Sequence, residues 1–195
     1  LKNQVTSGAF SVRGITAIDE DAGRLYFTAN AREAGEDPYY NHAYRVNLDG
    51  SGLRLLNPGN YDHRSTFNES GKFFVDNYAR VNTVPAAALI NASGQKVLDL
   101  QKADFSQLFE AGYQFPEPFK VKAGDGVTDL YGVMYKPFDF DSTKSYPIVE
   151  YVYPGPQTES VSKFFSTNST ETALAQFGMI VVTVGNRGGH PNRSK

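Results

Sequence analysis

The sequence of 195 residues contains no cysteine and no tryptophan, and its longest nearly apolar run is short, Met179–Val184. Without cysteine, the chain can form no disulfide, no thiolate nucleophile and no cysteine zinc site, and its redox compartment stays open. The apolar run is far shorter than the roughly 20 residues of a membrane-spanning helix. The formal net charge is −2, and acidic and basic residues are mixed along the sequence. This charge pattern does not indicate binding to nucleic acid or to an anionic membrane.

Aromatic residues are abundant despite the missing tryptophan, with 12 tyrosines and 14 phenylalanines. Both residue types favour strands, so we expect a β-rich chain, and its length allows one large domain or two smaller ones. The sequence begins at Leu1 rather than at methionine, and its first ten residues lack the apolar stretch of a signal peptide. We therefore expect the chain to be an excerpt of a longer protein.

The N-terminal half repeats one scheme. Arg13–Ala31 and Arg64–Ala79 each contain a strand, an acidic turn with glycine and a second strand, which predicts a hairpin. Each hairpin is followed by another pair of strands, and Gly50 or Gly52 in the first turn matches Gly94 in the second. The repeat of about 40–50 residues has the size of a propeller blade. Two antiparallel meanders packed as a sandwich are the alternative, and the repeat length favours blades.

The polar and ionisable residues of this half give no catalytic set. The link Arg32–Asn41 could contact a ligand or a neighbouring subunit or be merely solvated, and the sequence does not decide. We place His42 and His63 in propeller turns and His190 in a glycine-rich loop. No base, nucleophile and orienting group can be assembled from them, so a structural or solvated role is expected for each. No spacing of histidine and carboxylates suggests a metal site.

Pattern and composition change after a short predicted helix at Asp104–Gly112, where prolines break the periodicity. We place a domain boundary near Tyr113–Pro118, which divides the chain into residues 1–113 and 114–195. Beyond the boundary we expect an antiparallel hairpin, two strands and two helical segments. Their predicted ranges are Phe119–Lys122, Leu130–Tyr135, Tyr146–Tyr153, Ser160–Phe165, Glu171–Phe177 and Met179–Val184. Strand, helix and strand in that order predict a βαβ unit, with the last strand covered on both faces of a parallel sheet.

The stretch Tyr146–Gln157 carries the candidate site. A buried strand is expected there, and it ends abruptly in a Tyr-Pro-Gly-Pro turn that begins at Tyr153. Ligands of α/β sheets lie beyond the carboxyl ends of strands, so Tyr153 is where chemistry would be placed. The alternative is that Tyr153 only packs against the end of the strand.

Several stretches, taken together and in order, resemble the dipeptidyl peptidase IV family, a branch of the prolyl oligopeptidase clan of serine peptidases. These stretches are Gly23–Phe27, Ser70–Phe74, Leu130–Pro137, Lys144–Gln157 and Val184–Gly189. The resemblance implies a mixed fold, in which the C-terminal blades of a β-propeller precede the first part of an α/β-hydrolase domain. It also implies a serine exopeptidase that releases N-terminal dipeptides of the X-Pro or X-Ala type from peptides.

Carried over by position, Tyr153 matches the family's oxyanion-hole tyrosine. Arg187 and Gly188 fall in the loop after the next strand, which in the family is structural and lies near the active site. The chemistry suits a phenol, because a donor already aimed at the developing oxyanion lowers the barrier to acyl transfer.

The catalytic triad is not found in this sequence. A nucleophile elbow needs Gly-x-Ser-x-Gly, and no serine has this context; Ser51, for example, has Asp49 behind it and Leu53 ahead. The family's paired glutamates, which grip the free amine of the substrate, are absent too. We therefore expect residues 1–113 to be the last two propeller blades and residues 114–195 the start of the hydrolase domain. The chain alone is expected to be inactive.

Other expectations follow from the same resemblance. The substrate is a peptide, no cofactor or metal is required, and neither a nucleic-acid partner nor a membrane segment is expected. A homodimer is an assembly that the family allows, and a periplasmic or extracellular setting is favoured over the cytosol. The alternatives are another peptidase of the clan or a non-catalytic homologue that binds peptides.

Overall fold

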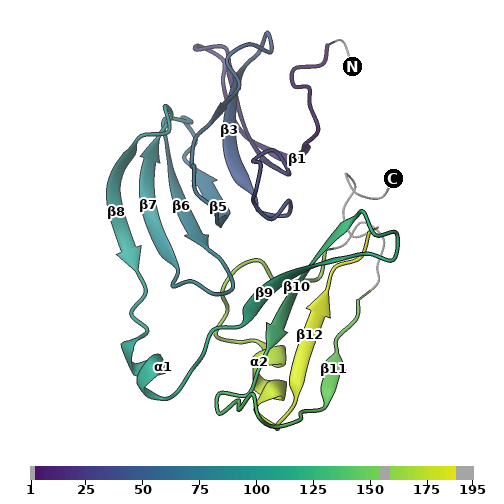
Figure 1. Ribbon diagram of the computed structural model, residues 1–195. Helices are drawn as coiled ribbons and strands as arrows, with labels where there is room; N and C mark the ends of the chain where they lie inside the picture. Colours follow the sequence, from purple (N-terminus) through teal and green to yellow (C-terminus); the bar gives the residue numbers. More distant parts are fainter. Residues whose placement is uncertain (1–2, 154–158, 188–195) are drawn as a thin grey trace. The chain divides into compact units, whose positions relative to one another are not determined.

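The computed structural model describes residues 3–153 and 159–187 (Figure 1). This part of the chain holds three four-stranded sheets and two short helices. The chain divides into two compact units, the first being Leu1–Ala79 with Pro85–Ala103 and the second Arg80–Val84 with Asp104–Lys195. No helix of the described residues is long and apolar enough to span a membrane.

The first unit consists of two antiparallel meanders, each with its strands in sequence order. One sheet contains β1 (Ser11–Asp19), β2 (Arg24–Asn30), β3 (His42–Asn47) and β4 (Arg54–Leu55). The other contains β5 (Asp62–Phe67), β6 (Phe73–Ala79), β7 (Ala86–Asn91) and β8 (Lys96–Lys102). The predicted hairpins and their following strand pairs are thus confirmed, and four-stranded meanders of this kind are consistent with propeller blades.

The internal repeat is visible in the turn before the last strand of each sheet. Gly50 and Gly94 both have a positive φ, 88° and 79°, and each N–H donates to the carbonyl three residues back at 2.8 Å. A Cβ at Gly50 would lie 2.9 Å from the Val5 backbone oxygen, and a Cβ at Gly94 would lie 2.9 Å from the Leu56 backbone oxygen. Gly50, rather than Gly52, is therefore the equivalent of Gly94, and both turns require glycine for the same two reasons.

The core of the first unit lies between its two sheets. Alternate residues of a strand point to opposite faces, so Tyr26 faces the second sheet while Phe27 faces the other way. The shared core contains Tyr26, Ala43, Leu56, Phe74, Ala88 and Ile90. On the far face of the first sheet, Phe27 and Tyr44 stack at 5.5 Å in a cluster against which Val5 and Phe10 of the N-terminal segment pack. The first sheet is thus covered on both faces.

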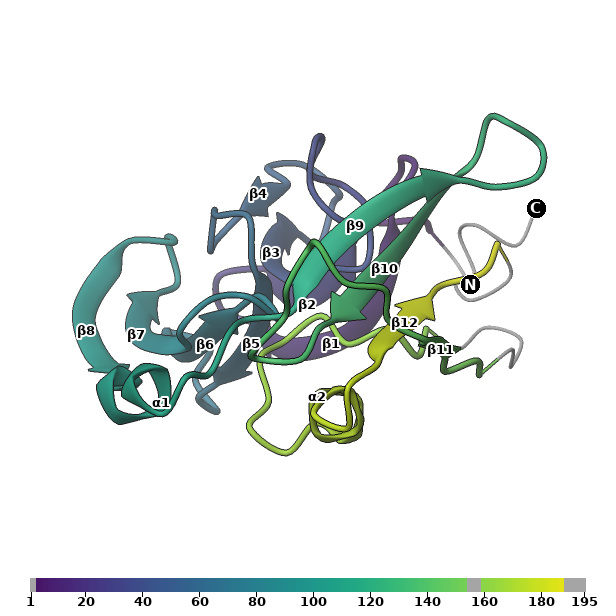
Figure 2. The ribbon, with the colours of Figure 1, turned by 60° about the horizontal axis from the view of Figure 1, so that its bottom comes forward.

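The second unit contains one mixed sheet in the order β11-β12-β10-β9 and two short helices. Its elements are β9 (Glu117–Lys122), β10 (Asp129–Tyr135), β11 (Ile148–Glu150) and β12 (Ile180–Val184), with α1 (Ser106–Glu110) and α2 (Thr170–Ala175). Figure 2 shows β12 between β10 and β11. The core packs Val133 and Tyr135 of β10 against Val181 of β12 and Ala175 of α2. The predicted hairpin, short first helix and strand–helix–strand order are confirmed.

Two predictions about this sheet are wrong. Among the described strands only β11 and β12 pair in parallel, because β10 enters as the antiparallel neighbour of β12. β12 buries Val181 and Thr183 on one face, and its other residues, on the opposite face, are half-buried. The strand expected at Tyr146–Tyr153 was predicted to be buried, yet β11 spans only Ile148–Glu150 and all three of its residues are exposed in the described chain.

The predicted helix at Ser160–Phe165 is also absent, and the segment has no regular structure. Its helical spacing reflected real burial, because Val161 is 3% and Phe165 is 8% exposed. The two side chains reach the core without a helix: the Phe165 ring packs at 4.6 Å against that of Phe105. A carboxylate oxygen of Glu159 accepts the Val161 N–H at 2.9 Å, which supplies locally the partner that a helix would have given.

Candidate functional site

Tyr153 lies just beyond β11, at the edge where the parallel pair ends. Hydrogen bonding continues past the strand, because the Tyr151 N–H donates to the Val182 carbonyl at 2.9 Å. The register pairs Glu150 with Val182 at the end of β11, and Tyr153 follows three residues later. The side chain of Tyr153 is 53% exposed in the described chain. A phenol there can reach a ligand that approaches this edge of the sheet.

Gly185, the first residue after β12, leaves room for a carboxylate. Its N–H donates to the Tyr131 carbonyl at 2.9 Å, which continues the pairing with β10. A Cβ at Gly185 would lie 2.8 Å from Oε2 of Glu159, while Oε1 of Glu159 accepts the Val161 N–H. The Glu159 carboxylate therefore occupies the space that a side chain at residue 185 would take.

Arg187, also carried over from the family resemblance, is paired with an acid from a different element. Its Nη1 lies 3.0 Å from Oδ2 of Asp125 in the turn between β9 and β10. Asp125 also accepts hydrogen bonds from the Val127 N–H, the Thr128 N–H and the Thr128 hydroxyl. These bonds, the Thr128 hydroxyl foremost, and the charge of Arg187 hold the pKa of Asp125 well below its ordinary value. Gly188 and His190 lie outside the described residues.

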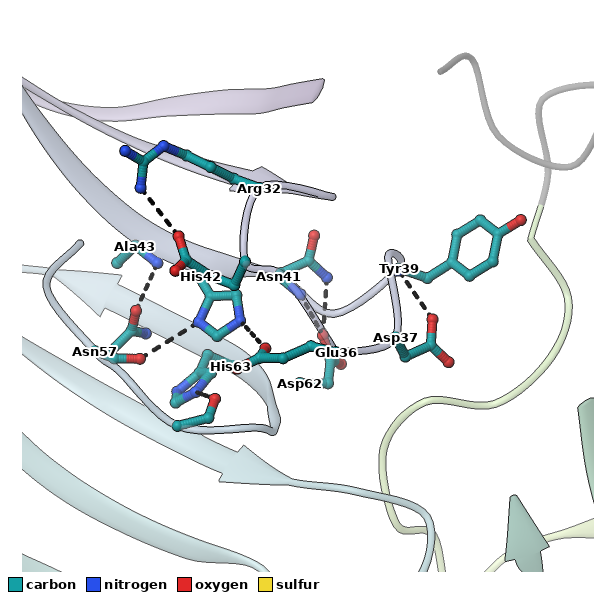
Figure 3. A network of polar contacts seen from close by, with 12 residues as sticks. Arg32, Glu36, Asp37, Tyr39, Asn41, His42, Ala43, Asn57, Asp62 and His63 are labelled. Atoms are coloured by element: carbon teal, nitrogen blue, oxygen red, sulfur yellow. Dashed lines mark hydrogen bonds and ion pairs between the residues drawn. The ribbon is translucent and has the colours of Figure 1, made fainter. Parts of the chain in front are cut away.

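The first unit holds a polar network between its sheets (Figure 3). His42 and His63 lie in strands β3 and β5, only 2% and 4% exposed, so the prediction that both fall in turns is wrong. His42 Nε2 is 2.8 Å from Glu36 Oε2, and His63 Nδ1 is 2.7 Å from Asp76 Oδ2. The two rings are 4.8 Å apart. Each buried ring has a carboxylate as a partner inside the fold.

Part of this network has the composition of a catalytic triad without its geometry. Ser65 donates its hydroxyl to Asp76 Oδ1 at 2.7 Å, and His63 Nε2 faces the Gly59 carbonyl at 3.2 Å. A nucleophilic serine would have to bond the histidine rather than the acid. Asn57 instead completes a structural tie, since its amide nitrogen donates to Asp76 Oδ1 and its oxygen accepts the Ala43 N–H. The network joins the two sheets.

The link Arg32–Asn41, whose role the sequence left open, belongs to the same framework. Glu33 accepts the Tyr44 hydroxyl at 2.9 Å, and Asp37 accepts the Tyr39 N–H at 2.9 Å. Burial, with the hydrogen bond to Glu33 and its charge, raises the pKa of Tyr44. The acidic side chains of this link, Glu33, Glu36 and Asp37, thus form hydrogen bonds or ion pairs with other residues of the chain. Across the residues that the structure describes, no group of three or more histidines and carboxylates could hold a metal ion.

Comparison with known proteins agrees with this architecture. The family model of the dipeptidyl peptidase IV N-terminal region matches residues 1–85. The probable dipeptidyl-aminopeptidase B of Aspergillus fumigatus is 32% identical over 194 residues, which cover 94% of this chain and 20% of the relative. Dipeptidyl-aminopeptidase B of Aspergillus niger is 31% identical over 182 residues, which cover 89% and 19%.

A solved structure extends the likeness through both units. The crystal structure of a protein from Bacteroides ovatus, assigned as a dipeptidyl aminopeptidase IV, superposes with a TM-score of 0.78 at 28% identity. The match covers 98% of this chain and 27% of that one. These matches support membership of the dipeptidyl peptidase IV family. It spans about a fifth of the length of the curated relatives it matches.

Sequence reasoning missed two features that the family fold brings together. The first is the pair of buried histidines in β3 and β5, which no alternation of polar and apolar residues around His63 marks. The second is the pairing of Asp125 with Arg187, which are far apart in the sequence. Asp125 was visible only as a turn residue, and no local pattern could name its partner.

Proposed function

We propose that the chain is part of a serine exopeptidase that releases X-Pro or X-Ala dipeptides from the N-termini of peptides, and that Tyr153 belongs to its oxyanion hole. The observation that carries the proposal is the position of Tyr153. Its side chain is 53% exposed, at the carboxyl end of a strand that runs parallel to β12. Membership of the dipeptidyl peptidase IV family supports the reaction class.

The domain organisation is part of the proposal. Residues 1–113 are the last two blades of a propeller, and residues 114–195 are the first part of an α/β-hydrolase domain. The two four-stranded meanders and the parallel pair β11–β12 with α2 between them support this assignment. The compact units divide the chain after Ala103 instead, so α1 falls in the unit of the mixed sheet.

The chemistry assigns one role to the phenol. When a serine attacks the scissile carbonyl, its oxygen gains negative charge, and a hydroxyl held in place stabilises that charge without reorganising. Removing one donor of this kind typically costs about 2.7–4 kcal/mol of activation free energy. The serine, acid and base come from other parts of the longer protein, because no serine here lies in Gly-x-Ser-x-Gly. The 195 residues alone therefore hydrolyse no Gly-Pro reporter.

The test uses a longer protein that carries this chain and a Gly-Pro reporter with a free amine. Tyr153→Phe lowers kcat by about 10²–10³-fold and leaves KM nearly unchanged, because the hydrogen bond forms in the transition state. Tyr151→Phe is the matched control, since Tyr151 is similarly exposed, at 51%, two residues earlier. It keeps wild-type kcat.

Other outcomes would reject the assignment. Equal losses in Tyr153→Phe and Tyr151→Phe, or a change confined to KM, would remove Tyr153 from the oxyanion hole. Cleavage of reporters with a blocked amine would indicate another peptidase of the clan. A longer protein that binds peptides and cleaves none would indicate a non-catalytic homologue.

A further inference from the structure

The loop after β12 lies beside the candidate oxyanion site. β11 and β12 are neighbouring parallel strands; Tyr153 follows the carboxyl end of β11 and Gly185 that of β12. Gly185 also bonds the Tyr131 carbonyl of β10 on its other side. Both residues therefore lie beyond the carboxyl ends of the same parallel pair, where ligands of such sheets bind.

Two acids from different segments meet this short loop. Glu159 presses its carboxylate against Gly185, where a Cβ would lie 2.8 Å from Oε2. Two residues further on, Arg187 reaches Asp125 at 3.0 Å. The first and third residues after β12 are thus each held by an acid, once by close packing and once by an ion pair.

The acid that holds Arg187 is itself rigid. Asp125 accepts the N–H of Val127 at 3.0 Å and of Thr128 at 2.9 Å, and the Thr128 hydroxyl at 2.6 Å. The turn that carries it is short, because the Ala123 N–H donates to the Thr128 carbonyl at 2.8 Å. A carboxylate with this many fixed bonds presents Oδ2 to Arg187 in one orientation.

We propose that Asp125 is a positioning residue for the peptidase reaction: through Arg187 it fixes the loop after β12, at the same edge of the sheet as Tyr153. The inference rests on the proposed function. An ion pair between side chains that are 30% and 52% exposed adds little to stability, typically about 0–1 kcal/mol. Its contribution is therefore to the placement of the loop, and it shows in kcat rather than in unfolding.

The informative variant is Asp125→Asn in the longer protein. Its amide oxygen still accepts the Val127 and Thr128 N–H groups, whereas the charge that pairs with Arg187 is lost. We expect kcat to fall about 3–10-fold and KM to change less than about twofold, since small displacements around a reacting centre are costly. Amide exchange at Gly185 speeds up, and the denaturation midpoint stays the same.

Asp141→Asn is the matched control. Asp141 likewise accepts the N–H and the hydroxyl of a threonine two residues on, Thr143, but its ion-pair partner is Lys144 rather than Arg187, so kcat and exchange at Gly185 stay at wild-type values. Arg187→Gln should reproduce Asp125→Asn, and the double variant should be no worse than either single variant, because both remove the same contact.

The outcomes separate this inference from the proposed function. If the wild type is active and Tyr153→Phe is impaired while Asp125→Asn has normal kcat and normal Gly185 exchange, the positioning role is wrong and the function stands. Additive losses in the double variant would also overturn the role. If the wild type cleaves no reporter, the proposed function and its positioning residue fall together. Exchange at Gly185 then still reports whether Asp125 anchors the loop.

Discussion

In the first unit, two antiparallel sheets share a core and bury their polar residues between them, as the contact of His63 with Asp76 at 2.7 Å illustrates. In the second unit, a mixed sheet buries an almost wholly apolar core and keeps its charged pairs near the surface, as with Asp125 and Arg187. Its edge strand β11 and Tyr153 are exposed. The two units thus place polar groups in opposite ways.

This difference separates structural from functional chemistry. A histidine–carboxylate pair is the usual mark of catalysis, yet here it is buried, fully engaged and without a nucleophile on the histidine. The candidate catalytic group is a single exposed phenol at the end of a strand. In this chain the buried histidine–carboxylate pair is structural, and the group that we propose for catalysis is exposed.

Asp76→Ala in the first unit should have the largest effect, and it tests whether the buried polar contacts of this unit stabilise the fold. Asp76 is 1% exposed, and its loss leaves three buried donors without their acceptor, those of His63, Asn57 and Ser65. We expect unfolding in denaturant to become easier by about 3–5 kcal/mol. Lys96→Ala is the control, because its pair with Asp99 is exposed and contributes at most about 1 kcal/mol. Equal effects would show that burial does not distinguish the two kinds of pair.

A smaller effect is expected from Gly132→Ala in the second unit. A Cβ there would meet the Thr183 backbone oxygen at 2.7 Å and the ring of Phe119. Because the backbone of a paired strand moves little, the cost should approach about 3 kcal/mol, the upper end for overpacking. Gly124→Ala is the matched control, since nothing lies within 4 Å of its Cβ position. Denaturation that finds both variants alike would contradict the tight fit of β10.

The smallest effect is confined to alkaline pH and concerns Tyr135, which is 4% exposed. Burial, with the charge of Glu171, raises the pKa of Tyr135 to about 12. An unfolded phenol ionises near pH 10, so this contribution to stability is complete below about pH 10 and declines as pH rises towards 12. At about 1.4 kcal/mol per unit, the loss is at most about 2.7 kcal/mol.

The measurement compares the pH dependence of unfolding in the wild type and in Tyr135→Phe. The variant should lose less stability than the wild type between pH 10 and 12, because it has no phenol to ionise at this position. Parallel declines in the two proteins would show that Tyr135 does not contribute.

Much of the fold could be predicted from the sequence because its signals are local. Glycine turns and alternating residues predicted nearly every strand of the first unit and the hairpin of the second. The short helix before Tyr113 was predicted as well. The helix expected at Ser160–Phe165 failed because apolar spacing reports burial, and burial there is achieved without helical hydrogen bonds. The exposure of β11 could not be predicted, since it depends on what packs on the two faces of the sheet and not on the residues of the strand itself.

The sequence by itself determined the repeat of two meanders, the strand–helix–strand order and the position of Tyr153 at a strand end, because each depends on residues close together in the chain. Only the tertiary structure decided that His42 and His63 meet between sheets, that β10 makes the second sheet mixed, and that Asp125 reaches Arg187. Those contacts join residues far apart along the chain, and their energy exists only once the strands have paired.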